Sequence, residues 1–329
     1  MISDNKNISA FDISDEPDWT PPPWPEGLPD PGIYHGIPFQ EYKSWPACNA
    51  SALKIAANVT AKHMRAYMSG LMDTDSPSRR FGRAQHCYML EGLEAFESRI
   101  SVATPCAAPI QKGARAGQPC GCEGKHRLDG LWYCGKHAKA GEDVGDFITG
   151  NEWENIKAAA HEITKHKTVN LFRAHGGTEV SLIWERDGLP CKGRIDKLIP
   201  GATMETGETV PAIMDLKKIL PCKGTEYELQ KAIREYGYDI SAAWYCDGYE
   251  RLQGERPLFI WVFAESGYPY DVAARQASAA TMEVGRSKAQ TVWDLYRQNV
   301  QHDTWQGYGD DLETIDPAEW EQKRYGLTR

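Results

Sequence analysis

The sequence predicts an α/β fold, an α+β arrangement in which helices flank a mixed β-sheet, with one small module inserted into it. Three observations lead to this prediction. Segments with the periodicity of amphipathic helices alternate with short apolar runs typical of strands over most of the 329 residues. Residues 104–145 lack this periodicity and are rich in glycine, cysteine and lysine. Residues 1–31 are rich in proline and acidic side chains, a composition that cannot bury enough surface to fold alone.

The predicted domain organisation follows from these changes in composition. We expect a flexible, acidic, proline-rich arm over residues 1–31 and an acidic tail over 303–329. Between them we expect one domain over 32–302, interrupted by the insert 104–145. The chain is long enough to bury a large core, and 41% hydrophobic with 25% charged residues is ordinary globular usage.

The predicted elements follow one another in a mixed order. Helices are expected over 49–70, 151–172, 226–235, 238–251 and 273–300, and a further helix follows Ser76-Pro77-Ser78 and extends to Leu93. Strands are expected over 99–102, 179–184, 193–199, 210–217 and 257–263. The dipeptide Asp187-Gly188 favours a hairpin turn between the second and third of these strands.

The net charge of −9 at first argues against a nucleic-acid partner, because phosphate binding favours a basic surface. The charges are unevenly distributed, however. Residues 1–31 carry −6, residues 303–321 carry −7 and residues 322–329 carry +3. Residues 32–302 are left with +1, so the composition does not exclude a protein that binds DNA.

The sequence favours a protein of the cytoplasm. It has no apolar run of the roughly 18 residues that a membrane span needs, and we expect no membrane partner. The first residues contain no apolar signal core. The nine cysteines are an odd number, and four of them fall between Cys106 and Cys134, which favours reduced thiols with one local metal site over a disulfide framework.

Three charged residues interrupt the apolar strand candidates. Asp215 and Lys217 lie two positions apart and therefore share one face of a strand that should be buried. Asp196 interrupts the preceding strand in the same way. Two carboxylates on neighbouring strands predict a magnesium or manganese site, beside a lysine that can orient water or stabilise phosphate charge. The alternative is a structural ion pair between Lys217 and one aspartate.

Four segments in a fixed order resemble a known family. The first two are 32–54, which contains Gly-Ile-Tyr-His-Gly-Ile-Pro and Ser-Ala-Leu-Lys, and 81–91, which contains Phe-Gly-Arg-Ala-Gln-His. The other two are 193–217, which contains Gly-Arg-Ile-Asp and Asp-Leu-Lys, and 238–248. Together they resemble the PD-(D/E)XK nuclease superfamily, its RecB-type branch, and within it the exonuclease VIII-like phage exodeoxyribonucleases. The resemblance implies a restriction-endonuclease-like core over the domain 32–302.

The resemblance implies an active site that binds Mg²⁺ or Mn²⁺. The implied metal ligands are His86, Asp196, Asp215 and the backbone carbonyl of Leu216, with Lys217 as the catalytic lysine. Two further candidates for catalytic roles are Glu179, on the preceding strand, and Tyr245, on the helix after the active strand. The alternatives are a solvated charge for Glu179 and a packing or surface residue for His86.

The resemblance also implies an activity and its partners. It implies 5′→3′ digestion of double-stranded DNA with a free end, which leaves 3′ single strands for a phage annealing protein in recombination. It further implies a homo-oligomer, in the cytoplasm of a bacterial host if a phage encodes the chain. One departure is Ser241, where the family has glutamine four residues before Tyr245. Two alternatives therefore stay open: a non-catalytic DNA- or partner-binding protein on this scaffold, and an endonuclease.

The insert contains five potential metal ligands. They are Cys106, Cys120, Cys122, Cys134 and His137. The Cys-x-x-His end is typical of zinc sites, so we expect Zn²⁺ bound by four of the five. An iron–sulfur cluster and free thiols are the alternatives. Residues 106–140 carry +4 and two aromatic residues, which fits an element that contacts DNA. A protein-docking or purely stabilising insert fits equally well.

Overall fold

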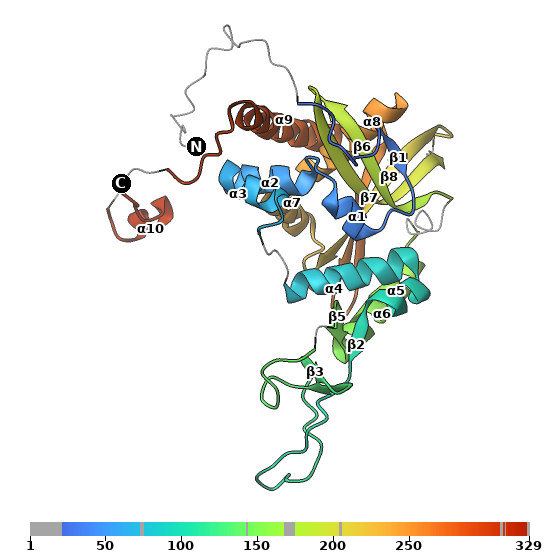
Figure 1. Cartoon of the computed structure of the whole chain (residues 1–329), viewed down its shortest axis with the longest axis vertical. Helices are drawn as coiled ribbons and strands as arrows, with labels where there is room; N and C mark the ends of the chain where they lie inside the picture. Colours follow the sequence, from blue (N-terminus) through green and yellow to red (C-terminus); the bar gives the residue numbers. More distant parts are fainter. Residues whose placement is uncertain are drawn as a thin grey trace.

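The computed structural model describes residues 22–72, 76–142, 144–167, 175–203, 206–309, 312 and 314–327. Its centre is a six-stranded sheet in the order β1-β6-β7-β8-β9-β10 (Figure 1). Neighbouring strands are antiparallel except β8 and β9, which are parallel, so the predicted mixed sheet is confirmed. The strands are β1 (Gly32–Tyr34), β6 (Gly177–Arg186), β7 (Leu189–Thr203), β8 (Thr209–Ile219), β9 (Leu258–Glu265) and β10 (Val272–Gln276).

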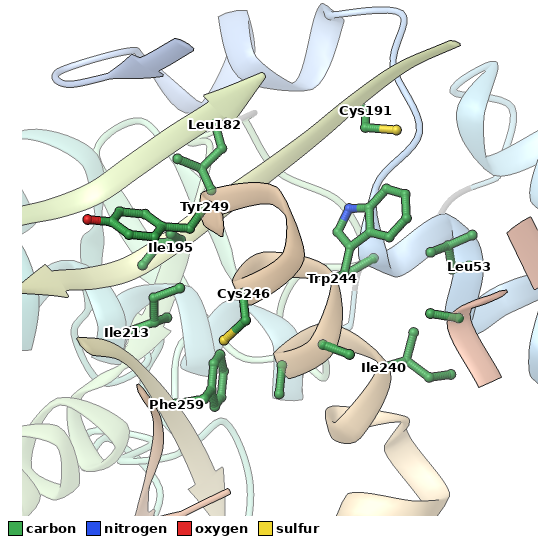
Figure 2. Packing of buried hydrophobic residues seen from close by; sticks show 14 of the residues in the cluster. Leu53, Leu182, Cys191, Ile195, Ile213, Ile240, Trp244, Cys246, Tyr249 and Phe259 are labelled. Carbon is green, nitrogen blue, oxygen red and sulfur yellow. The ribbon is translucent and has the colours of Figure 1, made fainter. Parts of the chain in front are cut away.

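One face of the sheet is covered by α8 (Tyr238–Gln253), which packs on β6, β7 and β9. Figure 2 shows the Trp244 and Cys246 side chains of this helix among apolar side chains of the sheet. The helix comes close to the sheet at Gly248, where a Cβ atom would lie 2.8 Å from the Trp184 ring. Behind α8 pack α2 (Ala50–Asn58) and α9 (Ala279–His302).

The other face is covered by α6 (Gly150–Lys165), whose Ile163 packs with apolar residues of β8 and β9. A second group of helices lies beside it: α4 (Pro77–His86), the π-helical turn η2 (Cys87–Glu91) and α5 (Leu93–Arg99). The remaining helices are α1 (Phe39–Ser44), α3 (Ala61–Met68), α7 (Glu226–Tyr236) and α10 (Glu319–Arg324). Among the helices that the structure describes, none is both long and apolar enough to cross a membrane.

Strand β8 is the middle of this layered structure, and its side chains alternate between the two faces. Ile213 packs in the cluster under α8, whereas Met214 and Leu216 pack in the cluster under α6. A strand buried on both faces reads as a continuous apolar run, which explains why two charged residues in it are conspicuous. Asp215 and Lys217 lie two and four positions after Ile213, so their side chains are on the same face of the strand, the one covered by α8.

The cysteine-rich residues 104–146 connect β2 (Ser101–Ala103) to β5 (Phe147–Thr149), and these two strands pair in parallel. This connection contains a short hairpin of β3 (His126–Leu128) and β4 (Leu131–Tyr133). In Figure 1 it extends away from the main sheet, beyond α4 and α6.

Three predicted helices have different bounds in the structure. The helix 49–70 is broken into α2 and α3, because the Thr60 side chain accepts the His63 N–H and starts a new helix. The helix 151–172 ends as α6 at Lys165, and 168–172 lie outside the described residues. The helix 273–300 begins only at Ala279, because β10 occupies 272–276 as an edge strand paired with β9.

Candidate functional site

Asp196 lies where β7 and β8 stop pairing. The ladder between the two strands ends at Lys197 and Met214. Beyond that point the Asp196 carboxylate accepts the backbone N–H of Leu216 at 2.7 Å. A side chain thus takes the place of a backbone acceptor, and the opened strands leave room for functional groups between them.

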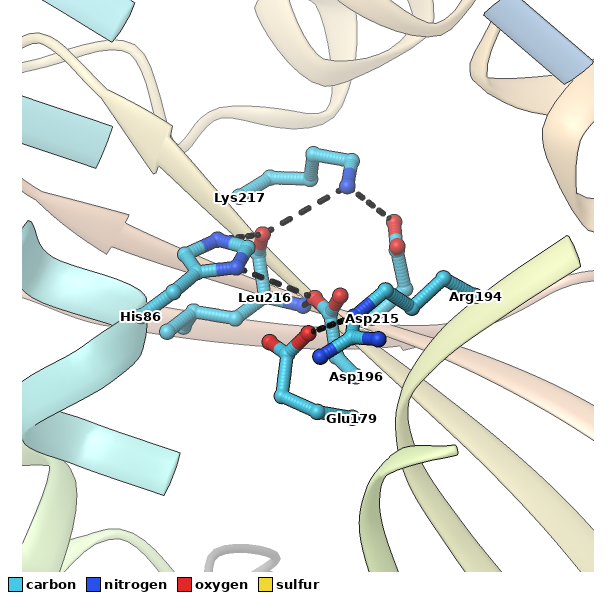
Figure 3. A network of polar contacts seen from close by, with 7 residues as sticks. All are labelled: His86, Glu179, Arg194, Asp196, Asp215, Leu216 and Lys217. Atoms are coloured by element: carbon cyan, nitrogen blue, oxygen red, sulfur yellow. Dashed lines mark hydrogen bonds and ion pairs between the residues drawn. The ribbon is translucent and has the colours of Figure 1, made fainter. Parts of the chain in front are cut away.

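Helix α4 brings His86 to the same point. Ser76 caps the start of this helix, and its end passes at His86 into the π-helical turn η2, a feature frequent at functional sites. His86 Nε2 lies 2.9 Å from the Leu216 carbonyl oxygen, and Nδ1 lies 3.6 Å from Asp196 Oδ2 (Figure 3). Because a carbonyl only accepts, Nε2 carries the proton, and in the neutral ring the Nδ1 lone pair faces Asp196.

Glu179 joins this group from β6. Its φ of +51° is unusual for a residue with a side chain, and it falls in a gap of the β6–β7 register, across from Asp196. An ion pair with Arg194 at 2.5 Å holds the carboxylate. Ligand atoms of His86, Glu179 and Asp196 all lie within 4.8 Å of one another, so these three residues are able to hold a metal ion.

Asp215 and Lys217 form a separate pair at the edge of this group. Lys217 Nζ lies 2.6 Å from Asp215 Oδ2 and 3.5 Å from the Leu216 carbonyl oxygen (Figure 3). Of the four metal ligands that the sequence predicts, the structure therefore brings His86, Asp196 and the Leu216 carbonyl together. It places Asp215 against the lysine instead, and it adds Glu179 to the group.

Burial and like charges shift the acid–base properties of these residues. Burial, followed by the charge of Asp215, raises the pKa of Asp196 to about 7. Burial and the Asp196 charge also raise the pKa of Glu179, against the influence of Arg194. Burial lowers the pKa of His86, with Lys217 acting in the same direction. Burial alone would lower the pKa of Lys217, but Asp215 and Asp196 outweigh it and raise the pKa.

A second lysine, Lys54, lies beside the pair. Its ammonium lies 6.0 Å from the centre of the Tyr238 ring, and Lys217 Nζ lies 5.3 Å from the centre of the same ring. Burial, followed by the charge of Lys217, lowers the pKa of Lys54 to about 8. Its side chain forms no ion pair or hydrogen bond in the described part of the chain. The sequence pattern predicts no role for Lys54, because only the fold brings it to the same Tyr238 ring as Lys217.

Tyr245 and Ser241 lie on α8 beside β7. The Tyr245 ring packs against Gly193, where a Cβ atom would lie 3.0 Å from the ring, so glycine is needed for this contact. Burial raises the pKa of Tyr245 well above its ordinary value, which keeps the phenol protonated. Ser241, at the position where glutamine was expected, is buried.

Two comparisons with known proteins gave matches. Residues 41–317 match a family described as a PDDEXK-like domain of unknown function (DUF3799). The chain belongs to this family. The fold is similar to the crystal structure of a "putative exonuclease" from Eubacterium rectale, with a TM-score of 0.55 and 14% sequence identity over 89% of this chain and 100% of that one. None of the curated proteins matches the sequence.

The residues of the PDDEXK-like core fit a divalent metal ion, which PDDEXK nucleases use. Two carboxylates whose pKa values are raised by burial and by neighbouring charge gain stability when a cation lies between them. A neutral imidazole nitrogen completes a mixed oxygen and nitrogen set. Asp215 Oδ2 is buried and lacks a hydrogen bond of regular geometry despite the nearby Lys217, so it is a further available oxygen.

A second set of potential ligands, outside the PDDEXK-like core, is the Cys₃His group of Cys106, Cys120, Cys134 and His137. Their ligand atoms also lie within 4.8 Å of one another. His137 Nδ1 lies 3.3 Å from Cys106 Sγ and 3.4 Å from Cys134 Sγ, and Cys120 Sγ lies 3.9 Å from Cys134 Sγ. Zinc–sulfur bonds of about 2.3 Å in a tetrahedron separate the sulfurs by about 3.8 Å, so the spacing fits.

The fifth candidate in the insert, Cys122, is exposed and does not belong to the group. Cys134 is well suited to metal binding, because the backbone N–H groups of Lys136 and His137 stabilise its thiolate and its pKa is lowered to about 6. The cysteines are not joined in disulfides in the described part of the chain.

Proposed function

We propose that this protein is a metal-dependent nuclease that hydrolyses phosphodiester bonds of DNA. The observation that carries the proposal is the convergence of His86, Glu179 and Asp196 from three elements, next to Lys217 and Asp215, at the point where two strands of a PDDEXK-like core separate. Perturbed acidic groups and a lysine in one place are typical of catalytic sites.

The metal ion is Mg²⁺ or Mn²⁺, held by His86, Glu179 and Asp196, with Asp215 as a further oxygen donor. When bound, such an ion polarises a phosphate oxygen and lowers the pKa of water. Lys217 remains protonated at neutral pH because its pKa is raised, so its ammonium stabilises the negative charge of the phosphate. Asp215 positions this ammonium. Arg194 positions the carboxylate of Glu179.

We further propose that the enzyme is an exonuclease of the exonuclease VIII-like branch. The segments quoted from the sequence support this, and the protein of similar fold is described as a "putative exonuclease". Digestion would run 5′→3′ from a free duplex end and supply 3′ single strands to a phage annealing protein. A homo-oligomer in the cytoplasm belongs to the same proposal, and an endonuclease of the same core is the alternative.

The test uses two substrates and two variants. The full chain is incubated with Mg²⁺ and either end-labelled linear duplex or closed circular duplex. We expect digestion of the linear DNA only, and a loss of at least 1,000-fold in Asp215→Asn. Asp294→Asn, on α9, is the matched control and should stay active. Cleavage of circular DNA would favour the endonuclease, and DNA binding without cleavage by the wild type would favour the non-catalytic scaffold.

For the insert we propose a structural zinc site formed by Cys106, Cys120, Cys134 and His137. The support is the near-tetrahedral spacing of the four ligand atoms, together with the fact that Trp132 is the one large apolar side chain buried in this segment among the described residues. A small module without a core of its own takes stability from its metal, because the ligands converge only when it is folded.

A further inference from the structure

We propose that the insert is an arm that binds the backbone of duplex DNA outside the active site, through lysine and arginine side chains held in place by the Cys₃His site. The name insert arm is used here for residues 104–146. The inference rests on the proposed function, which supplies the DNA, and it names a second contact surface for that substrate.

The first argument is that the cations of the insert arm lack partners within the protein. The side chains of Lys112, Lys125 and Lys136 are exposed and form no ion pair or hydrogen bond in the described part of the chain. Arg115 bonds only to the Gln118 amide, which leaves its charge unpaired. Unpaired lysine and arginine side chains on exposed loops are able to bind phosphate groups.

Three acidic residues of the insert arm, Glu123, Glu142 and Asp146, are by contrast already engaged, Asp146 by Arg83. Glu123 accepts a hydrogen bond from the Asn151 side chain at 2.8 Å. Glu142 accepts the backbone N–H of Asp129 at 2.7 Å, which ties it to the hairpin turn. The charges of these three carboxylates are therefore partly taken up within the protein, whereas those of Lys112, Arg115, Lys125 and Lys136 are not.

The second argument is the charge of the insert arm relative to its surroundings. Residues 106–140 of the insert arm carry +4, whereas 32–302 as a whole carry only +1, so the rest of that body is acidic. Glu142, Asp143 and Asp146 bring the whole insert arm, 104–146, to +1, and Asp146 is paired with Arg83. A zinc ion with three thiolates adds about −1, which leaves residues 106–140 at about +3. The basic charge that a polyanion needs is therefore concentrated in residues 106–140 of the insert arm.

The third argument is that the insert arm is fixed to the helix that carries His86. Arg83 of α4 donates two hydrogen bonds to the Asp146 carboxylate, at 2.5 and 2.7 Å. The Arg80 guanidinium lies 5.2 Å from the centre of the Phe147 ring, and Trp132 packs on the same ring at 5.0 Å. The position of the insert arm relative to the active site is thus set by direct contacts, and Figure 1 shows it extending from the end of the molecule next to α4.

These features favour nucleic acid over a protein partner. Apart from Leu128 and Leu131 at the hairpin turn, the exposed part of the insert arm offers no large apolar side chain in the described residues. Protein interfaces have an apolar centre, whereas contacts with a DNA backbone are made by separate cations. One long duplex would then contact the active site and the insert arm together.

The test measures binding of duplex DNA without cleavage. Full-length Asp215→Asn protein is compared with the same protein carrying Lys112→Gln, Arg115→Gln and Lys125→Gln. The matched control carries Lys62→Gln, Lys167→Gln and Arg251→Gln, exposed residues outside the insert arm that form no ion pair in the described part of the chain. Fluorescence anisotropy with duplexes of 8 and 30 base pairs gives the affinity at several salt concentrations, and metal analysis verifies that zinc content is unchanged.

We expect the insert-arm triple variant to bind the longer duplex about 10- to 100-fold more weakly, with a salt slope lower by about 2 to 3, because each lost phosphate contact removes about 0.9 from the slope. The loss of affinity for the 8-base-pair duplex should be smaller. The proposal would be overturned if the insert-arm triple variant kept the salt slope of wild type, a result that would point to a protein-docking insert. It would also be overturned if the control triple variant lost as much affinity for DNA. If wild type proves inactive but the triple variant still lowers the slope, only the nuclease proposal fails.

Discussion

At the scale of single residues, the site depends on a backbone group as much as on side chains. The Leu216 N–H is bonded to Asp196, and its carbonyl accepts from His86. Both groups are free for these contacts because β7 no longer pairs with β8 there. A substitution of Leu216 that keeps its apolar packing would leave this arrangement intact, since no side-chain atom takes part in it.

Lys54 leads to a prediction about pH. If its ammonium contacts a substrate phosphate, kcat/KM of the wild type should decline as the pH rises through about 8. The pKa of Lys54 is lowered to about 8, so the ammonium is present below this pH and lost above it. Lys217 cannot cause this decline, because its pKa is raised. Values of kcat/KM for linear duplex DNA between pH 6.5 and 9.5 provide the measurement.

Two variants complete this test. Lys54→Met should lower kcat/KM about 10- to 100-fold below pH 8, and its pH profile should lack the decline. Lys54→Arg should keep the activity and also lack the decline, because a guanidinium stays charged throughout. A wild-type decline that persists in both variants would contradict a role for this residue.

At the scale of elements, the N-terminal helix α1 is held to the sheet by one buried lysine. Lys192 of β7 donates to the carbonyls of Tyr42, Lys43 and Trp45 at 2.9, 3.2 and 2.6 Å, at the C-terminal end of α1. Helix ends leave carbonyls without partners, and a cation there is favourable. This contact fixes the segment that precedes α2 and so contributes to the position of Lys54.

Lys192→Met is therefore expected to lower the free energy of unfolding by about 2 kcal/mol, because the carbonyls of Tyr42, Lys43 and Trp45 lose their charged donor. Urea denaturation followed by tryptophan fluorescence measures the change. The matched control is Lys43→Met, an exposed lysine of α1 itself, which should change stability by less than about 0.5 kcal/mol. Equal stability of the Lys192 variant and wild type would show that water replaces the ammonium without cost.

The elements also show where sequence patterns are informative. The hairpin of β6 and β7, the buried strand β9 and helices α7 and α8 agree with their predicted positions, because strong periodicity and turn residues define them. The strand β10 was predicted as the start of a helix. Its five residues are stable as a strand only because they pair with β9 at the edge of the sheet, and this pairing is not encoded in the segment itself.

At the scale of the whole molecule, the main body and the insert arm are stabilised in different ways. The main clusters contain four fully buried tryptophans, whereas Trp132 is the one buried large apolar side chain of the insert arm in the described residues. Hydrophobic burial thus stabilises the body, and the metal site is expected to stabilise the insert arm.

Loss of the metal should therefore loosen the insert arm and leave the body folded. We expect Cys134→Ser to lose about one zinc ion per chain by metal analysis. Limited trypsin digestion should then cut within 104–146 at least 10-fold faster, while the thermal unfolding of the body stays within a few degrees of wild type. Cys122→Ser, outside the Cys₃His group, is the matched control and should keep zinc and protease resistance. Intact zinc in Cys134→Ser would contradict the ligand assignment.

The sequence by itself determined which chemistry is present: two aspartates and a lysine in buried strands, a histidine at a helix end, and a cysteine cluster between two elements. These features are local, and their spacing along the chain is enough to find them. Only the tertiary structure decided how they combine. It placed Glu179 beside His86 and Asp196, turned Asp215 toward Lys217, and left Cys122 outside the Cys₃His group. The physical reason is that each of these outcomes depends on strand register, on a positive φ or on the docking of a distant helix, which are set by packing across the whole fold.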